Sequence, residues 1–269
     1  MKLGFIGGGN MAHALIVGLK NQQFAMHDIT VIELDANRRF ELNQNLGVNA
    51  SAELTDIQTC DVIVLAIKPQ QLHALAKTLA PLLTKQLVIS IAAGIRLSDL
   101  SRWLGDYATI IRAKPNTPAQ IQAGVTGLYA LPAVSKKQIG LADQVLSAAG
   151  STFWLDSEEK LDAVTAISGS GPAYVFYLIE ALHEAALNLG LSEAHARQLS
   201  IATFKGASLL ADASTTPIAT LRAQVTSKGG TTEQGLLSLH NSQVKQAIIL
   251  ATQKAYERAK TLGDELGGG

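Results

Sequence analysis

The fold of this chain is decided by the stretch Leu3-Gly4-Phe5-Ile6-Gly7-Gly8-Gly9-Asn10-Met11-Ala12. A short apolar strand leads directly into three glycines, and a helical pattern begins at Asn10. This order is typical of a dinucleotide-binding loop: one glycine permits the tight turn, a second lets the backbone approach a pyrophosphate, and a third small residue packs between helix and strand. Gly7, Gly9 and Ala12 occupy those positions, so the sequence predicts a bound dinucleotide.

The rest of the first half repeats the rhythm of an apolar strand followed by a helix. The expected strands lie at residues 3–6, 29–32, 62–67, 87–91 and 109–111, and the expected helices near residues 10–21, 36–45, 70–80 and 98–104. Such alternation predicts an α/β fold with a doubly wound parallel sheet of the Rossmann type. A strand at 125–129, a helix at 135–149 and a strand at 152–155 could complete the sheet, which gives a dinucleotide-binding domain over residues 1–157.

The second half contains no convincing strand after Glu158, so residues 158–269 are expected to form an all-helical domain. Its helix at residues 172–189 carries one polar stripe and is apolar nearly everywhere else. A helix of this kind must be buried on several sides, and a single chain supplies few partners for it. We therefore predict a C-terminal dimerisation domain and a homodimer. The alternative is a compact monomeric domain with this helix at its centre.

The composition excludes several classes of partner. Lys+Arg and Asp+Glu each number 22, so the chain has no net field that would attract nucleic acid or an anionic membrane. A small-molecule partner is expected instead. Cys60 is the only cysteine, which precludes an intrachain disulfide, and no apolar run has the length of a membrane span or a secretory core. We expect a soluble, cytoplasmic protein. The six histidines include no pair at metal-ligand spacing, so no metal site is predicted.

Cofactor preference depends on residues after the second expected strand. Glu33 follows the glycine loop at about the spacing where a carboxylate accepts hydrogen bonds from the adenosine ribose and favours NADH. Arg38 and Arg39 follow closely, and a guanidinium there could instead hold the 2′-phosphate of NADPH. The alternatives are an exposed acid at a strand end and two arginines on a solvated helix face. The sequence leaves NADH and NADPH both open.

Ligands of open α/β sheets bind beyond the carboxyl ends of the strands. Ala66-Ile67-Lys68-Pro69 and Ser90-Ile91-Ala92-Ala93-Gly94 follow strands and are expected to line the dinucleotide crevice, although Pro69 also suits the first turn of a helix. A third strand end carries Arg112-Ala113-Lys114-Pro115-Asn116-Thr117-Pro118, a loop that two prolines stiffen around an amide and a hydroxyl. The same segment would also make sense as a plain turn.

The loop Val225-Thr226-Ser227-Lys228-Gly229-Gly230-Thr231-Thr232 interrupts the helical second half and has the composition of an anion site. Its hydroxyls and lysine can donate hydrogen bonds, its glycines let backbone N–H groups approach a ligand, and a helix beginning near Thr231 adds its dipole. The alternative is an ordinary helix–helix loop with Thr231 or Thr232 as the N-cap.

Three segments together resemble one family, the pyrroline-5-carboxylate reductases, over essentially the whole chain. Gly4 to Met11 is similar to that family's cofactor loop, Ile167-Ser168-Gly169-Ser170-Gly171-Pro172-Ala173-Tyr174 to its central motif, and Val225 to Thr232 to its substrate loop. Ser90 to Gly94 and Pro115 to Pro118 fit as well. The resemblance implies reduction of Δ1-pyrroline-5-carboxylate to L-proline by NADPH or NADH, the last step of proline biosynthesis. It also implies a C-terminal helical domain that interleaves with a second copy.

The strand ends and the resemblance together define the expected site. The predicted cofactor-binding residues are Ile6, Gly7, Gly8, Gly9, Asn10, Met11, Glu33, Ala66, Ile67, Lys68, Pro69, Ala92 and Asn116. The residues that the resemblance implies for substrate binding are Val225, Thr226, Ser227, Gly229, Gly230, Thr231 and Thr232, with the first two shaping the pocket from the partner subunit. Two positions depart from the family pattern: Lys228 stands where proline is usual, and Lys114 where methionine is usual.

We expect Thr232 to be the catalytic residue. Backbone N–H groups and the Ser227 hydroxyl would grip the substrate carboxylate, while the Thr232 hydroxyl would hydrogen-bond the ring nitrogen and orient the imine for hydride transfer. A threonine hydroxyl is a poor acid unless water relays the proton. Two other functions are alternatives. A β-hydroxyacid dehydrogenase would need a lysine at the position of Val175, and a non-catalytic NAD(P)-sensing regulatory protein would bind the cofactor without turnover. A homodimer and a higher homo-oligomer of dimers are both compatible with the sequence.

Overall fold

The computed structural model describes residues 1–267, which fall into two compact units. The first unit contains Met1–Ser170 together with the described residues from Ala255 onward, and the second contains Gly171–Lys254. Residues 268 and 269, which the predicted second domain included, lie outside the described residues. The predicted domain boundary between residues 157 and 158 stays a prediction.

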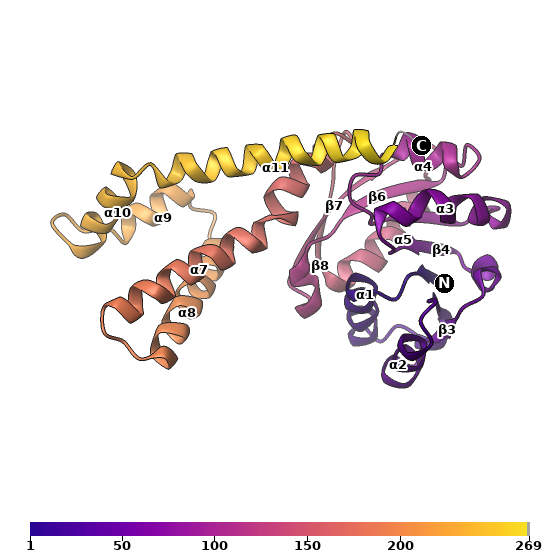
Figure 1. Cartoon of the computed structure of the whole chain (residues 1–269), viewed down its shortest axis with the longest axis horizontal. Helices are drawn as coiled ribbons and strands as arrows, with labels where there is room; N and C mark the ends of the chain where they lie inside the picture. The colour runs from indigo at the N-terminus through magenta and orange to yellow at the C-terminus, as the bar shows by residue number, and fades with distance from the viewer. Residues whose placement is uncertain (268–269) are drawn as a thin grey trace. The chain divides into compact units, whose positions relative to one another are not determined.

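The first unit is built on one eight-stranded sheet (Figure 1). Its strands are β1 (Leu3–Ile6), β2 (Ile29–Ile32), β3 (Asn49–Ser51), β4 (Val62–Leu65), β5 (Leu87–Ser90), β6 (Ile110–Lys114), β7 (Gly124–Ala130) and β8 (Gly150–Trp154). They lie in the order β3-β2-β1-β4-β5-β6-β7-β8, with β1 to β6 parallel, β7 antiparallel to β6, and β8 parallel to β7. The crossover between β1 and β4 confirms the predicted doubly wound Rossmann sheet.

Helices cover both faces of this sheet. The helices α1 (Asn10–Asn21), α2 (Ala36–Leu46) and α5 (Lys136–Leu146) contribute to one core cluster, and α3 (Pro69–Leu79) and α4 (Leu97–Trp103) to the other. Successive residues of β4 alternate between them, since Val64 joins the first cluster while Ile63 and Leu65 join the second. Burial on both faces explains why β4 is apolar throughout. After β8, the helix α6 (Lys160–Val164) leads into a π-helical turn at Thr165–Gly169.

The structure differs from the predicted strands in several places. β3 was not predicted, because its three residues form a short edge strand with no β-branched side chain. β7 reverses direction because only a single 3₁₀ turn, Thr117–Ile121, separates it from β6, which is too short for a parallel crossover. The strands predicted at 62–67 and 87–91 end earlier, at Leu65 and Ser90.

The strand register brings the carboxyl ends of the parallel strands together. Ile6 is paired with Ile32 on one side and Leu65 on the other, and Leu65 is in turn paired with Ser90. Ser90 is paired with Arg112 on β6. The glycine loop, Glu33 and the segments that follow β4, β5 and β6 therefore leave the sheet at one edge.

The second unit contains α7 (Gly171–Asn188), α8 (Glu193–Asp212), α9 (Ile218–Gln224), α10 (Thr231–Asn241) and the first part of α11 (Val244–Gly267). Among residues 171–254, only Ala196 and Ser200 are buried. The predicted apolar helix is present as α7, yet it exposes Phe176 by 66% and Tyr177 by 72%. A compact monomeric domain centred on this helix is therefore wrong, because one copy leaves the apolar helices of this unit without a core.

Candidate functional site

The first glycine of the dinucleotide loop is fixed by backbone geometry. Gly7 has a φ of +97°, and its N–H donates to the carbonyl of Ile32 over 2.8 Å. A Cβ at this position would lie 2.7 Å from the carbonyl oxygen of Ala66. No other residue fits here, because both the left-handed conformation and the contact with Ala66 require glycine.

The third glycine opens the helix that follows. Gly9 is the N-cap of α1 and has an extended backbone, with no side-chain cap on the first helical turn. The nearest atom to a Cβ at Gly9 would be 4.0 Å away, so the loop is open on this side. The uncapped N-terminus of α1 offers N–H donors to a pyrophosphate, and the absence of a side chain at Gly9 lets the pyrophosphate approach the backbone. Asn10 is exposed and Met11 is half-buried at the start of the same helix.

The predicted crevice residues lie along the same edge of the sheet. The Ala66 N–H donates to the carbonyl of Ile6 over 2.8 Å, which continues the pairing of β1 and β4 into the loop. Lys68 is exposed and is the N-cap of α3, and Pro69 starts that helix, as the sequence allowed. Ala92 is buried after β5. Half-buried Ile67 lies close enough to the glycine loop to contact any Cβ at position 7.

Asn116 is buried and joins two segments of the first unit. Its Nδ2 donates to the carbonyl of Ser168 over 3.1 Å, and its Oδ1 accepts the N–H of Val125 over 2.9 Å. These bonds tie the loop after β6 to the start of β7 and to the π-helical turn. The segment is therefore more than a plain turn, and the amide of Asn116 holds its shape.

Lys114 packs against the same π-helical turn. Its Nζ donates to the carbonyl of Pro115 over 2.9 Å, and a Cβ on Gly169 would lie 3.1 Å from that Nζ. Burial lowers the pKa of Lys114, and the nearby charge of Arg112 lowers it further. A methionine would fill this space without the cost of burying a charge.

Arg112 of β6 is the centre of an ion-pair cluster that the sequence did not indicate. Arg112 on β6 pairs with Glu158 over 2.8 Å and with Asp162 over 3.5 Å. Glu158 Oε1 also accepts the N–H of Leu97 at the start of α4, over 2.8 Å. One carboxylate therefore connects β6, α4 and the segment before α6.

The predicted substrate loop joins α9 to α10 in the second unit. The helix α10 begins at Thr231, as expected, and its N-cap is Gly230, with an extended backbone and no side-chain cap, so the alternative of Thr231 or Thr232 as the N-cap is wrong. A Cβ on Gly230 would collide with the Ser227 hydroxyl, and the Gly230 N–H donates to the Ser227 carbonyl over 3.1 Å. A helix N-terminus without a side-chain cap leaves backbone donors for a ligand anion.

Some of the other residues of this loop form hydrogen bonds within the protein, and others are exposed. The Thr226 hydroxyl donates to the carbonyl of Arg222 over 2.7 Å, and the Gly229 N–H donates to Glu233 over 2.7 Å. Ser227, Lys228, Thr231 and Thr232 are exposed. Val225 is 63% exposed, a high value for an apolar side chain. The structure thus brings the predicted substrate residues into one loop, and Glu233 is a further member that the sequence did not single out.

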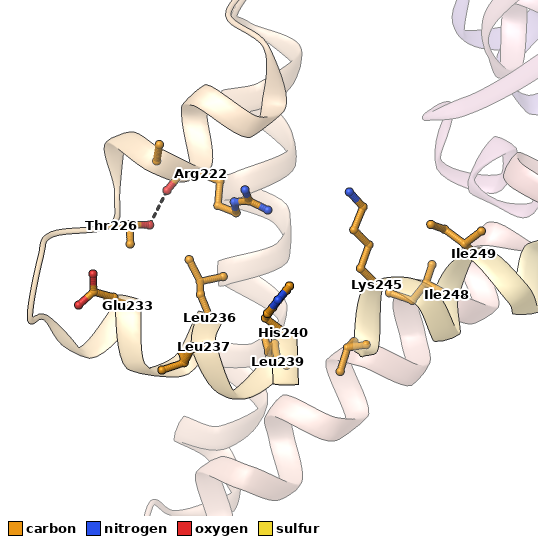
Figure 2. Close-up of a pocket in the computed structure, with 12 residues that line it drawn as sticks. Arg222, Thr226, Glu233, Leu236, Leu237, Leu239, His240, Lys245, Ile248 and Ile249 are labelled. Carbon is orange, nitrogen blue, oxygen red and sulfur yellow. Dashed lines mark hydrogen bonds between the residues drawn. The ribbon is translucent and has the colours of Figure 1, made fainter. Parts of the chain in front are cut away.

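A cavity of about 780 Å³ lies beside this loop (Figure 2). Thr226 and Glu233 line it at the end nearest the loop. Most of its remaining lining is apolar and comes from α10 and the start of α11, namely Leu236, Leu237, Leu239, Val244, Ile248 and Ile249. Such a lining suits apolar side chains better than a small polar ligand.

No group of His, Cys, Asp and Glu side chains that could hold a metal ion occurs among residues 1–267. Over the same residues, no helix is both long and apolar enough to cross a membrane.

The doubly wound sheet and its glycine loop define the class, a Rossmann-type oxidoreductase that uses a nicotinamide dinucleotide. Residues 158–262 match the family described as "Pyrroline-5-carboxylate reductase dimerisation", and residues 2–94 match "NADP oxidoreductase coenzyme F420-dependent". The pyrroline-5-carboxylate reductase of Pseudomonas aeruginosa is 41% identical over 268 residues, which cover 97% of this chain and 98% of that protein. The chain belongs to the pyrroline-5-carboxylate reductase family.

Solved structures agree with this membership. A pyrroline-5-carboxylate reductase from Coxiella burnetii is 39% identical, with a TM-score of 0.92, and the match covers 97% of this chain and 98% of that one. The pyrroline carboxylate reductase of Plasmodium falciparum, solved with NADP bound, is 29% identical with a TM-score of 0.88 and covers 98% of each chain. Because the second unit lacks a core and residues 158–262 match a dimerisation region, the protein is a homo-oligomer.

Proposed function

We propose that this protein reduces Δ1-pyrroline-5-carboxylate to L-proline, with NADPH or NADH as the reductant. The observation that carries the proposal is the end-to-end match to relatives of that name, which includes both the glycine loop and the loop before α10. The β-hydroxyacid dehydrogenase alternative has no support, because Val175 cannot transfer a proton.

On this proposal the cofactor binds at the carboxyl ends of the parallel strands. Gly7 provides the turn, and Gly9 with the first turn of α1 provides N–H donors for the pyrophosphate. Ala66, Ala92 and Asn116 follow β4, β5 and β6, and on this proposal they shape the wall beside the nicotinamide. When bound, the reduced nicotinamide supplies the hydride.

The loop before α10 would bind the substrate. The Ser227 hydroxyl and the uncapped N–H groups in the first turn of α10, which begins at Thr231, suit a carboxylate, because charge-assisted hydrogen bonds to backbone donors are strong. The Thr232 hydroxyl would hold the ring nitrogen and orient the imine carbon, and water would relay the proton. Val225 and Thr226 would shape the pocket of the partner subunit. Assembly of dimers into a larger oligomer and a cytoplasmic location complete the proposal.

The direct test follows nicotinamide oxidation by the purified protein with pyrroline-5-carboxylate, in parallel with NADPH and NADH. Turnover with at least one cofactor supports the proposal. Tight cofactor binding without turnover would instead favour a non-catalytic NAD(P)-sensing protein.

The role of Thr232 has its own test. We expect Thr232→Val to reduce kcat/KM about 10-fold or more, since one substrate hydrogen bond is lost and a donor position becomes apolar. Thr78→Val is the matched control, because the Thr78 hydroxyl donates to a carbonyl within α3 and Thr78 belongs to neither loop. Unchanged kcat and KM in Thr232→Val would exclude the proposed role.

A further inference from the structure

The loop before α10 contains a tight turn. The Gly230 N–H donates to the Ser227 carbonyl over 3.1 Å, which closes a β-turn of four residues. Gly229, the third residue of this turn, has a φ of +73°, whereas the φ of Lys228, the second residue, is not positive. A positive φ at the third position alone is the signature of a type II turn, which requires glycine there.

Glu233 binds the N–H group that this turn leaves unused. The Gly229 N–H donates to Oε2 of Glu233 over 2.7 Å. Glu233 is half-buried and belongs to the first turn of α10, and Figure 2 shows its carboxylate pointing into the bend of the loop. The side chain therefore ties the β-turn to the helix that follows it.

The proposed substrate contacts lie on both sides of this bond. The Ser227 hydroxyl comes before Gly229, and the uncapped N–H groups of α10 come after it. Two successive glycines give the backbone between these contacts a wide range of conformations. The bond from Gly229 to Glu233 restricts that range and keeps the hydroxyl and the helix N-terminus in one arrangement.

We infer that Glu233 is a positioning residue: its carboxylate holds the Ser227–Gly230 turn in the shape that binds the substrate, without contacting the substrate itself. The inference rests on the proposed function. A direct contact would place two carboxylates together, which repel each other. The benefit comes instead from a loop that is already ordered before binding, because less conformational entropy is then lost with the substrate.

Steady-state kinetics separates this role from a direct one. Glu233→Ala should raise the KM for pyrroline-5-carboxylate about 5-fold and leave kcat nearly unchanged, since a carboxylate grip acts equally on ground and transition states. Glu233→Gln keeps an oxygen that can accept the Gly229 N–H and should raise KM by less than about 2-fold. Glu193→Ala is the matched control: Glu193 lies in the first turn of α8, and its carboxylate contacts the His183 side chain.

A second substitution tests the turn itself. Proline suits the second position of a type II turn and fixes its φ, so Lys228→Pro should order the turn by another route. In the Lys228→Pro background, Glu233→Ala should therefore raise KM only about 2-fold. The four proteins form a double-mutant cycle, in which any contribution of the Lys228 charge cancels.

Amide hydrogen exchange, followed by mass spectrometry, reports on the same bond without turnover. The peptide that contains residues 225–233 should exchange faster in Glu233→Ala than in the wild type, and the Glu193→Ala variant should match the wild type in this peptide. Faster exchange is expected because the Gly229 N–H loses its acceptor and the turn opens more often.

Four results would overturn the inference. They are an unchanged KM or unchanged loop exchange in Glu233→Ala, a glutamine variant as impaired as the alanine variant, and an equal loss in the Lys228→Pro background. A fall in kcat at constant KM would also contradict it, since Glu233 would then act in the hydride step. A wild type that does not turn over pyrroline-5-carboxylate means that the proposed function itself fails, which the kinetics of the unmodified protein reveals before any variant is compared.

Discussion

Arg112 and Glu158 form an ion pair of 2.8 Å whose side chains are only 7% and 19% exposed. Removing one partner of a buried pair strips the other charge of its closest compensation, and Asp162 lies farther from Arg112, at 3.5 Å. We expect Glu158→Gln to lower the free energy of unfolding by about 3 kcal/mol, measured by urea titration. Lys160→Met is the control, because Lys160 pairs with Asp156 at the surface, and no measurable loss is expected there. A loss as small as that of the control would mean that Asp162 alone compensates Arg112.

Lys114→Met should stabilise the protein at neutral pH, because burial and the charge of Arg112 both disfavour the protonated form of Lys114 and lower its pKa. The pKa of Lys114 is lowered in the folded state, so the unfolded chain binds more protons as the pH approaches the ordinary value of 10.5. Wild-type stability therefore rises with pH in that range, and the advantage of Lys114→Met should shrink. Melting temperatures from pH 7 to pH 10 test this. A variant less stable than the wild type at pH 7 would contradict it.

Cys60 should be inert in the folded protein. Burial and the neighbouring Asp61 raise the pKa of its thiol to about 11, so almost no thiolate exists at pH 8. A thiol-specific chromogenic reagent should label the native protein slowly and the urea-unfolded protein fast, and the denatured sample is the control. Rapid labelling of the native protein at pH 8 would show that the segment around Cys60, just before β4, opens readily.

Gly7→Ala should abolish binding of both cofactors and destabilise the fold, because the new methyl group would meet the Ala66 carbonyl and the backbone has a φ of +97°. Gly140→Ala is the control. Gly140 lies within α5 with no atom near its Cβ position, and alanine there should stabilise the helix by up to about 1 kcal/mol. Fluorescence titration and thermal unfolding report the two effects. Cofactor binding by Gly7→Ala at wild-type affinity would contradict the geometry.

Phe176→Glu should weaken self-association. Phe176 is 66% exposed on α7, in the unit that lacks a core, and a charge there opposes burial against a second copy. Phe40→Glu is a matched control, since Phe40 is also 66% exposed but lies on α2 of the first unit. Sedimentation should show dissociation at micromolar concentration for the first variant only. Equal behaviour of the two variants would place the contact surface elsewhere.

Features with a local cause were predictable from the sequence. The glycine loop was found because strand, turn and helix follow one another within a few residues of Gly7, and α7 was found because its apolar pattern is continuous. The pairing of Arg112 with Glu158, 46 residues apart, has no local signature. The sequence does not indicate Gly230 as the N-cap, because the neighbouring threonines are better capping residues, yet both threonines lie within α10 and Gly230 has the extended backbone of an N-cap.

The scarcity of buried side chains in the second unit, limited to Ala196 and Ser200, also has a genetic consequence. Each newly made chain completes this region only by pairing, so its activity depends on how many copies the cell synthesises. An inactive variant that still pairs would capture normal chains in mixed assemblies. Mutations at the cofactor site should therefore interfere with a normal chain that is expressed in the same cell, whereas mutations that prevent pairing should not.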